Sequence, residues 1–184
     1  MVYIFLADGF ETIEALTVVD MLRRAAIDCQ TVSIQQTREV TSAHKISVQA
    51  DVLLADMKDC EADMYVLPGG IPGTPNLRAN DTVMALVKKQ YEADKFVAAI
   101  CAAPGIFSEL GFLKGRNAIC YPSFEEQLER EGANLVREGA VRDGHVITGR
   151  GMGTAIDFGA AIITALAGEE AAKKVMDSVC YRQV

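Results

Sequence analysis

The chain has 184 residues, half of them hydrophobic, and carries a formal net charge of −7. This size and composition exclude a disordered protein and predict one globular domain over residues 1–184 with a sizeable core. The negative charge and the lack of any Lys and Arg run argue against nucleic acid as a partner, because phosphate binding needs a basic patch. The apolar stretch 2–6 is too short for a signal peptide or a membrane span, so no membrane partner is expected.

The cysteines are five in number, widely spaced, and contain no C-x-x-C pair. An odd number at such spacings is typical of neither a disulfide framework nor a zinc ribbon. Because the chain also has only two histidines, no metal site is expected. This cysteine usage predicts a protein of the reducing cytoplasm. The five are Cys29, Cys60, Cys101, Cys120 and Cys180.

Strand and helix patterns alternate along the chain. Strands are predicted at residues 2–6, 31–34, 63–67, 96–100 and 117–120. Helices are predicted at residues 11–25, 82–91, 124–131, 155–166 and from 169 onward. Two hairpins are predicted within 40–47 and 134–149, the second turning at Asp143-Gly144. This alternation is typical of βαβ units and predicts an α/β three-layer sandwich, a mostly parallel sheet with helices on both faces.

Three segments with unusual sequences leave predicted strands at their carboxyl ends, where parallel sheets of this class hold their ligands. These segments are residues 8–11, 67–70 and 100–102. Because the carboxyl ends of parallel strands meet at one edge of the sheet, we expect the three segments to border a common crevice.

Glu14 lies in the early part of the first predicted helix, where a carboxylate complements the helix dipole. Its neighbours at helical spacing are mostly apolar: Phe10, Ile13, Val18 and Met21. A carboxyl buried among them tends to stay protonated and could donate a hydrogen bond to a nearby thiolate. Glu14 is therefore either a dipole partner or a functional acid.

The Leu-Pro-Gly-Gly run at 67–70 directly follows a predicted strand. Two glycines allow positive φ and let backbone N–H groups approach a ligand. One interpretation is that Gly70 supplies half of an oxyanion hole and the N–H of Ala102 the other half. The alternative is a tight turn without a ligand, which is what the run alone favours.

Cys101 follows the apolar strand 96–100 and precedes small residues, Pro104-Gly105 and a helical pattern. A nucleophile on such a sharp strand-to-helix turn is exposed at the edge of the sheet. The N–H groups and dipole at a helix start also stabilise a thiolate. The alternative is a cysteine that packs in the core, as free cysteines commonly do.

The glycine-rich run that ends at Thr154 matches neither phosphate-binding pattern. Thr154 and Asp157 have the spacing of a helix capping box. We expect Arg150 to have a structural role, paired with a carboxylate or lining an interface. His44 and His145 both fall in predicted hairpins, and we expect them to be solvated loop side chains.

Taken together, these segments resemble the ThiJ/PfpI superfamily, and within it the branch of the Parkinson-disease-associated deglycase and its bacterial relatives. No single match is specific, but the set occurs in the family order over most of the chain. The matching stretches are residues 6–14, 19–25, 66–70, 98–104 and 148–154.

The resemblance implies a flavodoxin-like fold that forms a homodimer. It implies that Cys101 is the nucleophile and the oxidation-sensitive thiol, and that Glu14 is a protonated carboxyl bonded to it. The N–H groups of Gly70 and Ala102 would hold an oxyanion. Relatives are described as glyoxalases without a cofactor, as deglycases of early glycation adducts, as oxidative-stress proteins and as chaperones, and the family name records a link to thiazole biosynthesis.

The sequence departs from the family pattern at two positions. Tyr121 stands before Pro122 where this branch often has a histidine, and a tyrosine hydroxyl is a poor general base near neutral pH. His44 stands where some relatives have an arginine that reaches the site of the partner subunit. Both residues are auxiliary site candidates.

These observations leave three hypotheses. The leading one is a cytoplasmic, cofactor-free cysteine enzyme that acts on small reactive carbonyls or their glycation adducts. The second is a non-enzymatic redox sensor or redox-regulated chaperone that uses Cys101. The third is an amidase-like hydrolase, for which His145 is the sole downstream histidine.

Overall fold

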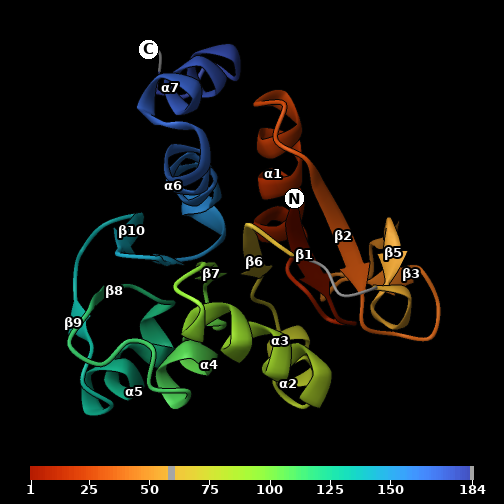
Figure 1. Ribbon diagram of the computed structural model, residues 1–184, viewed down its shortest axis with the longest axis horizontal. Helices are drawn as coiled ribbons and strands as arrows, with labels where there is room; N and C mark the ends of the chain where they lie inside the picture. The colour runs from red at the N-terminus through yellow and green to blue at the C-terminus, as the bar shows by residue number, and fades with distance from the viewer. Residues whose placement is uncertain (58–60, 183–184) are drawn as a thin grey trace.

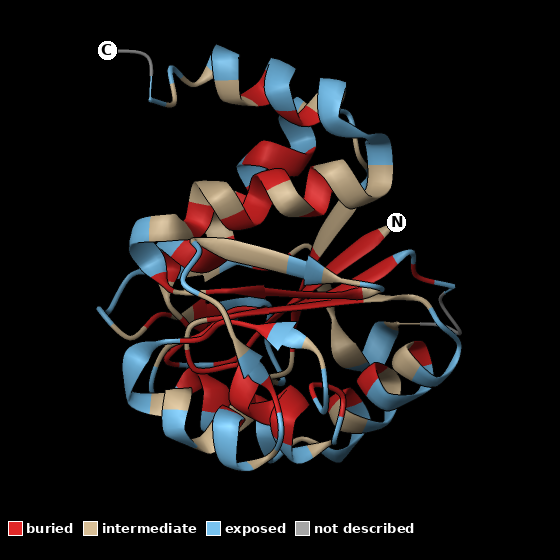
Figure 2. Cartoon of the chain, turned by 90° about the vertical axis from the view of Figure 1, so that its left-hand side faces the viewer, coloured by how far each residue is buried: buried red, intermediate tan, exposed pale blue. Residues whose placement is uncertain are grey.

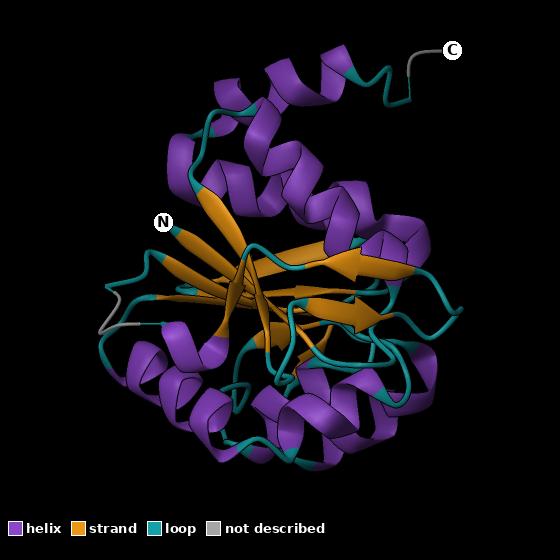
Figure 3. Ribbon diagram, turned by 90° about the vertical axis from the view of Figure 1, so that its right-hand side faces the viewer, coloured by secondary structure: helices purple, strands orange, loops and turns teal. Residues whose placement is uncertain are grey.

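The computed structural model describes residues 1–57 and 61–182 and has three layers, with a central sheet between two layers of helices (Figures 1 and 3). The sheet has seven strands in the order β10-β11-β7-β6-β1-β2-β5. The strands of this sheet are β1 Val2–Leu6, β2 Cys29–Ser33, β5 Val52–Leu53, β6 Met64–Leu67, β7 Phe96–Ile100, β10 Ala140–Asp143 and β11 Val146–Gly149. β10 runs antiparallel to β11 and the other strand pairs are parallel, so the predicted fold class is confirmed.

The helices divide between the two faces of the sheet (Figure 3). One layer holds α1 Thr12–Arg24, α6 Ala155–Ala167 and α7 Glu169–Ser178. The other holds α2 Gly73–Arg78, α3 Asp81–Glu92, α4 Pro104–Glu109 and α5 Glu125–Arg130. Two small pairs lie outside the main sheet: β3 Glu39–Thr41 with β4 Ser47–Gln49, and β8 Asn117–Ala118 with β9 Asn134–Leu135.

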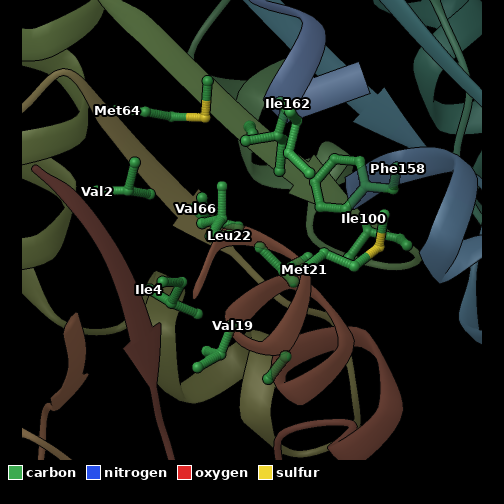
Figure 4. Packing of buried hydrophobic residues seen from close by; sticks show 14 of the residues in the cluster. Val2, Ile4, Val19, Met21, Leu22, Met64, Val66, Ile100, Phe158 and Ile162 are labelled. Atoms are coloured by element: carbon green, nitrogen blue, oxygen red, sulfur yellow. The ribbon is translucent and has the colours of Figure 1, made fainter. Parts of the chain in front are cut away.

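The central strands are buried on both faces, as Figure 2 shows. Side chains alternate along β1, so Ile4 joins the core beneath α1 and α6, whereas Phe5 joins the core on the opposite face. In the first core, Met21 of α1 lies near Phe158 of α6 (Figure 4). Gly159 permits this approach, because a Cβ there would lie 2.5 Å from the Met21 sulfur.

Helix α1 begins where its sequence favours a start. Glu11 is its N-cap, and the Glu11 carboxylate accepts the N–H of Ile13 at 3.2 Å. Arg23 and Arg24 occupy the last turn, where positive charge complements the dipole. The helix therefore starts at a fixed point directly after the β1 loop, which sets the position of Glu14.

Several predicted elements differ in extent from those observed. The predicted strand 117–120 is two residues long, and the β3–β4 hairpin spans 39–49. Helix α2 and strand β5 were not predicted. Helix α2 has only six residues and contains Gly73 and Pro75, so its sequence lacks a helical period.

The predicted capping box of Thr154 and Asp157 is wrong. Thr154 precedes α6, but its hydroxyl bonds the backbone of Gly151, donating to the carbonyl at 3.0 Å. Asp157 instead accepts the Tyr181 hydroxyl at 2.6 Å. Arg150 pairs with Glu125 at 3.0 Å, which agrees with the structural role expected for it. Within the described ranges, no helix is long and apolar enough to cross a membrane.

Candidate active site

Cys101 lies at the carboxyl end of β7, between β6 and β11. Its φ is +66°, a left-handed conformation that is strained for a residue with a side chain. Its N–H donates to Gly149 O at 3.0 Å, and α4 begins three residues later at Pro104. The predicted strand–turn–helix arrangement around Cys101 is therefore confirmed. Strain of this kind is typical of a nucleophile held at a sharp turn.

Glu14 reaches Cys101 from the first turns of α1. The Glu14 side chain is buried, with 1% of the residue exposed, and it lies close enough to the Cys101 thiol for each group to shift the pKa of the other. Its Oε2 accepts the N–H of Gly69 at 2.9 Å. Its Oε1 is buried and makes no hydrogen bond of ordinary geometry within the described residues, although the backbone of Met152 lies close enough to lower its pKa. An acid in such surroundings is poised to keep its proton.

Burial raises the pKa of Glu14 to about 7, against the lowering effects of Cys101 and Gly69. Burial, together with the charge and hydrogen bonding of Glu14, raises the pKa of Cys101 to about 12. Because the two acids face each other, they titrate as a unit. Between the two values the pair holds one proton, shared between carboxyl and sulfur.

The backbone N–H groups of Ala102 and Gly70 lie close enough to the Cys101 sulfur to lower its pKa. They therefore favour negative charge at this point, as the oxyanion prediction requires. Gly70 has φ +100°, and a Cβ there would lie 2.4 Å from Glu11 N and Gly9 O. This position accepts glycine alone, because a side chain would be both strained and blocked.

Gly69 has a part in the site that the sequence did not reveal. A Cβ at Gly69 would lie 2.6 Å from both the Cys101 Cβ and Glu14 Oε2, and 3.1 Å from the Cys101 sulfur. The missing side chain is therefore what allows the thiol and the carboxyl to meet. The Pro-Gly-Gly run indicated a backbone approach, but not which side chains pass over it.

We expect Gly69→Ala to separate Cys101 from Glu14 and to lower thiol reactivity more than tenfold. The cause is steric, since the new methyl group would overlap both side chains. Alkylation of Cys101 by iodoacetamide, followed by peptide mass spectrometry, measures the change. Gly153→Ala is the matched control, because nothing lies within 4 Å of a Cβ there. Equal reactivity in both variants would contradict this role of Gly69.

Tyr121 lies at the mouth of the site with 49% of the residue exposed. Its N–H donates to the Cys101 carbonyl at 2.8 Å. Its ring lies 3.5 Å from where a Gly151 Cβ would be, and that point is 3.9 Å from Glu14 Oε1. The Tyr121 ring and Glu14 therefore lie on either side of Gly151, and an auxiliary role for Tyr121 stays a prediction.

His44 lies apart from the thiol. Its exposed side chain approaches Glu11, with Nε2 and Oε2 separated by 3.6 Å. The hairpin that carries it is held to the β1 loop by a bond from Ala43 N–H to Phe10 O at 2.9 Å. Its exposure agrees with the solvated loop position expected, and its role toward a partner subunit stays a prediction.

His145 is not the solvated residue that the sequence predicted. Its side chain is only 15% exposed and packs on Tyr91, with ring centroids 4.8 Å apart. The His145 carbonyl accepts the N–H of Val97 at 3.0 Å, at the start of β7. Cys101 lies at the other end of the same strand, so His145 is at the opposite edge of the sheet. This placement contradicts a Cys101–His145 pair and with it the amidase-like hypothesis.

The comparisons with known proteins agree with this geometry. A solved structure, Toxoplasma gondii DJ-1 in oxidised form, superposes with a TM-score of 0.93 at 30% identity and covers 98% of each chain. DJ-1 homolog B of Arabidopsis thaliana is 37% identical over 98% of this chain, which spans only 41% of that relative. A deglycase of Thermococcus kodakarensis is 31% identical over 81% of this chain and 89% of its own length.

The family model covers most of the described fold. It matches residues 1–165, which include β1 through most of α6 and all of the residues placed around Cys101. The two DJ-1 homologs of Arabidopsis thaliana, each 37% identical, are longer proteins, of which the chain spans less than half. On the family match and on these similarities, the chain belongs to the DJ-1/PfpI family.

Proposed function

We propose that the chain is a cysteine-dependent enzyme that acts on small reactive carbonyls or their glycation adducts. The observation that carries this proposal is the Cys101–Glu14 pair, a thiol and a carboxyl of raised pKa that share one proton. Beside the sulfur, the N–H groups of Gly70 and Ala102 favour negative charge. A nucleophile, a proton carrier and two N–H donors are the groups that addition to a carbonyl needs.

With methylglyoxal, the thiolate of Cys101 attacks the aldehyde carbon, and the carbonyl oxygen takes a proton to give a hemithioacetal. Glu14 then carries the proton of that carbon to the neighbouring ketone carbon, and the hydroxyl proton of the hemithioacetal passes to the ketone oxygen. This transfer leaves a thioester: the aldehyde carbon has been oxidised and the ketone carbon reduced. Water cleaves the thioester, releases a 2-hydroxy acid and restores the thiol. In deglycation the same attack is followed by release of the amine.

The expected loss on Cys101→Ser is complete, because no other group of the pair can attack a carbonyl. Turnover is measured as 2-hydroxy acid formed from methylglyoxal. Cys180→Ser is the control, since Cys180 is exposed and lies in the last described turn of the chain. Background turnover by the wild type, or equal turnover by both variants, would remove the enzymatic proposal.

A redox role is the second candidate, and one observation favours it. The same N–H groups and protonated carboxyl that face the sulfur could hold the oxygens of a sulfenate or sulfinate. A relative of known structure, DJ-1 of Toxoplasma gondii, is described as oxidised. After mild peroxide we expect mass spectrometry to find oxygen first on Cys101. Earlier oxidation of Cys29, or of Cys60, which lies outside the described residues, would count against it.

We also propose that the chain forms a homodimer in a reducing compartment. Ile13, Ile46 and Met152 are 47%, 50% and 55% exposed, and all three lie near the start of α1. The described cysteines are free thiols. A second copy would cover these apolar side chains. Sedimentation velocity is expected to show a dimer that Ile13→Glu converts to monomer, and a monomeric wild type would exclude it.

A further inference from the structure

A cavity of about 360 Å³ is lined by residues of α2, α4 and the start of α5. Its volume is within the range of small-molecule sites, roughly 300–1,000 Å³. Its walls include Ile71, Ile106 and Phe124, which make much of it apolar. Neither the family match nor the proposed chemistry at Cys101 gives this cavity a role.

The cavity adjoins the candidate active site through both N–H donors. Ala102, whose N–H lies close to the Cys101 sulfur, is part of the cavity wall. Ile71, another wall residue, directly follows Gly70, the second donor. A group bound in the cavity therefore lies next to the positions that would hold the oxygen of an attacked carbonyl.

The charged groups of the cavity wall neutralise one another. Arg78 Nε and Glu109 Oε2 are 2.7 Å apart. The Gln127 amide donates to the other carboxylate oxygen, Oε1, at 3.3 Å. The wall therefore has little need of a charged ligand.

We propose that this cavity is a substrate subsite that binds the aryl or branched alkyl substituent of a 2-oxoaldehyde, an inference that rests on the proposed function. The apolar wall favours such a group through burial of its surface, and the neutralised rim disfavours a charged one. The adjacent donors at Gly70 and Ala102 place the carbonyl beside Cys101. Phenylglyoxal is therefore a better substrate than methylglyoxal.

The first test measures binding through Cys101 without requiring turnover. Phenacyl bromide and bromoacetone are both α-bromoketones, and in each case the sulfur bonds the methylene carbon as bromide leaves. Their rate ratio on Cys101, divided by the ratio for N-acetylcysteine, reports how the protein treats the aryl group. We expect a value of at least about 10 for the wild type, since apolar pocket contacts discriminate roughly 10- to 200-fold.

Ala79→Trp is the variant that fills the cavity. Ala79 is the exposed C-cap of α2 and lines the cavity without touching the Cys101 pair. Ala93→Trp is the matched control, because Ala93 is the exposed C-cap of α3 and lies outside this cavity. We expect Ala79→Trp to bring the normalised ratio close to 1 and Ala93→Trp to leave it unchanged.

A wild-type ratio equal to that of the free thiol would overturn the proposal. So would a ratio that survives in Ala79→Trp or falls equally in Ala93→Trp. If the melting temperature shows that Ala79→Trp is unfolded, Pro75→Phe tests the same wall from another exposed position. In parallel, kcat/KM is measured for phenylglyoxal and methylglyoxal. Selective alkylation with no turnover of either aldehyde would exclude the proposed function and leave the subsite supported.

Discussion

Tyr121→His is expected to raise the turnover of methylglyoxal by about 10²-fold, because general acid–base help is typically worth roughly 10²–10⁴-fold. The backbone of residue 121 is fixed by its bond to the Cys101 carbonyl, which a substitution leaves in place. The Tyr121 ring lies close to Gly151, and Glu14 Oε1 lies close to the same glycine. An imidazole there would stand beside the reacting atoms and could move a proton at neutral pH.

Tyr121→Phe is the control for the same substitution site. It keeps the ring and removes only the hydroxyl, so we expect kcat to change less than about threefold. Loss of turnover in Tyr121→Phe would show that the tyrosine hydroxyl itself carries the proton. If Tyr121→His gains nothing over the wild type, proton transfer is not what limits the reaction, and Glu14 alone serves that step.

Most strands and helices could be predicted from the sequence because they follow from the periodicity and length of its hydrophobic runs. Val2–Leu6 and Phe96–Ile100 are continuous apolar runs, and such runs are typical of parallel strands covered on both faces. The short helix α2 escaped prediction because Gly73 and Pro75 interrupt any helical pattern. Thr154 was misassigned for a related reason: the spacing to Asp157 is local, whereas Tyr181, the actual partner of Asp157, is distant in sequence.

The candidate site was predictable in its members but not in its contacts. Cys101, Glu14 and the Gly-Gly run each stand out in the sequence, and parallel topology brings their strand ends to one edge. The missing side chain of Gly69 lets the thiol and the carboxyl meet, and this contact exists only in the folded structure. His145 is a second example of a contact that the sequence does not reveal. Its position in a predicted hairpin suggested an exposed side chain, whereas in the structure it packs on Tyr91.

The largest effect on stability is expected from Glu14→Gln. Burial holds the folded-state pKa of Glu14 at about 7, above its ordinary value of 4.5. An acid whose pKa is higher in the folded state than in the unfolded state stabilises the fold at a pH below its unfolded-state pKa. This stabilisation is lost as the pH rises through the folded-state pKa. The wild type therefore loses roughly 3 kcal/mol between pH 4 and pH 8, at 1.36 kcal/mol per pKa unit. Glutamine has no proton to lose and escapes this loss.

Glu14→Gln should accordingly match the wild type in free energy of unfolding near pH 4 and exceed it by about 2–3 kcal/mol at pH 8. Urea denaturation at the two pH values measures the difference. In the wild type, Gly69 N–H donates to Glu14 Oε2 at 2.9 Å, and the side-chain carbonyl of a glutamine at position 14 can accept the same hydrogen bond. A difference between variant and wild type that is the same at both pH values would show that Glu14 titrates normally.

The pH dependence of Cys101 alkylation tests the thiol of the same Cys101–Glu14 pair. The wild-type alkylation rate of Cys101 is expected to rise only well above pH 7, because the proton lost near pH 7 leaves a Glu14 carboxylate whose charge raises the pKa of the thiol. Glu14→Leu removes the charge that raises the pKa of the thiol, so we expect the rise in its alkylation rate to shift to lower pH, although burial still holds that pKa above its ordinary value. Iodoacetamide rates measured from pH 5 to pH 10 by mass spectrometry separate the two profiles. Identical profiles in the wild type and Glu14→Leu would mean that the thiol and the carboxyl do not share a proton, and the proton-carrier role of Glu14 would be lost.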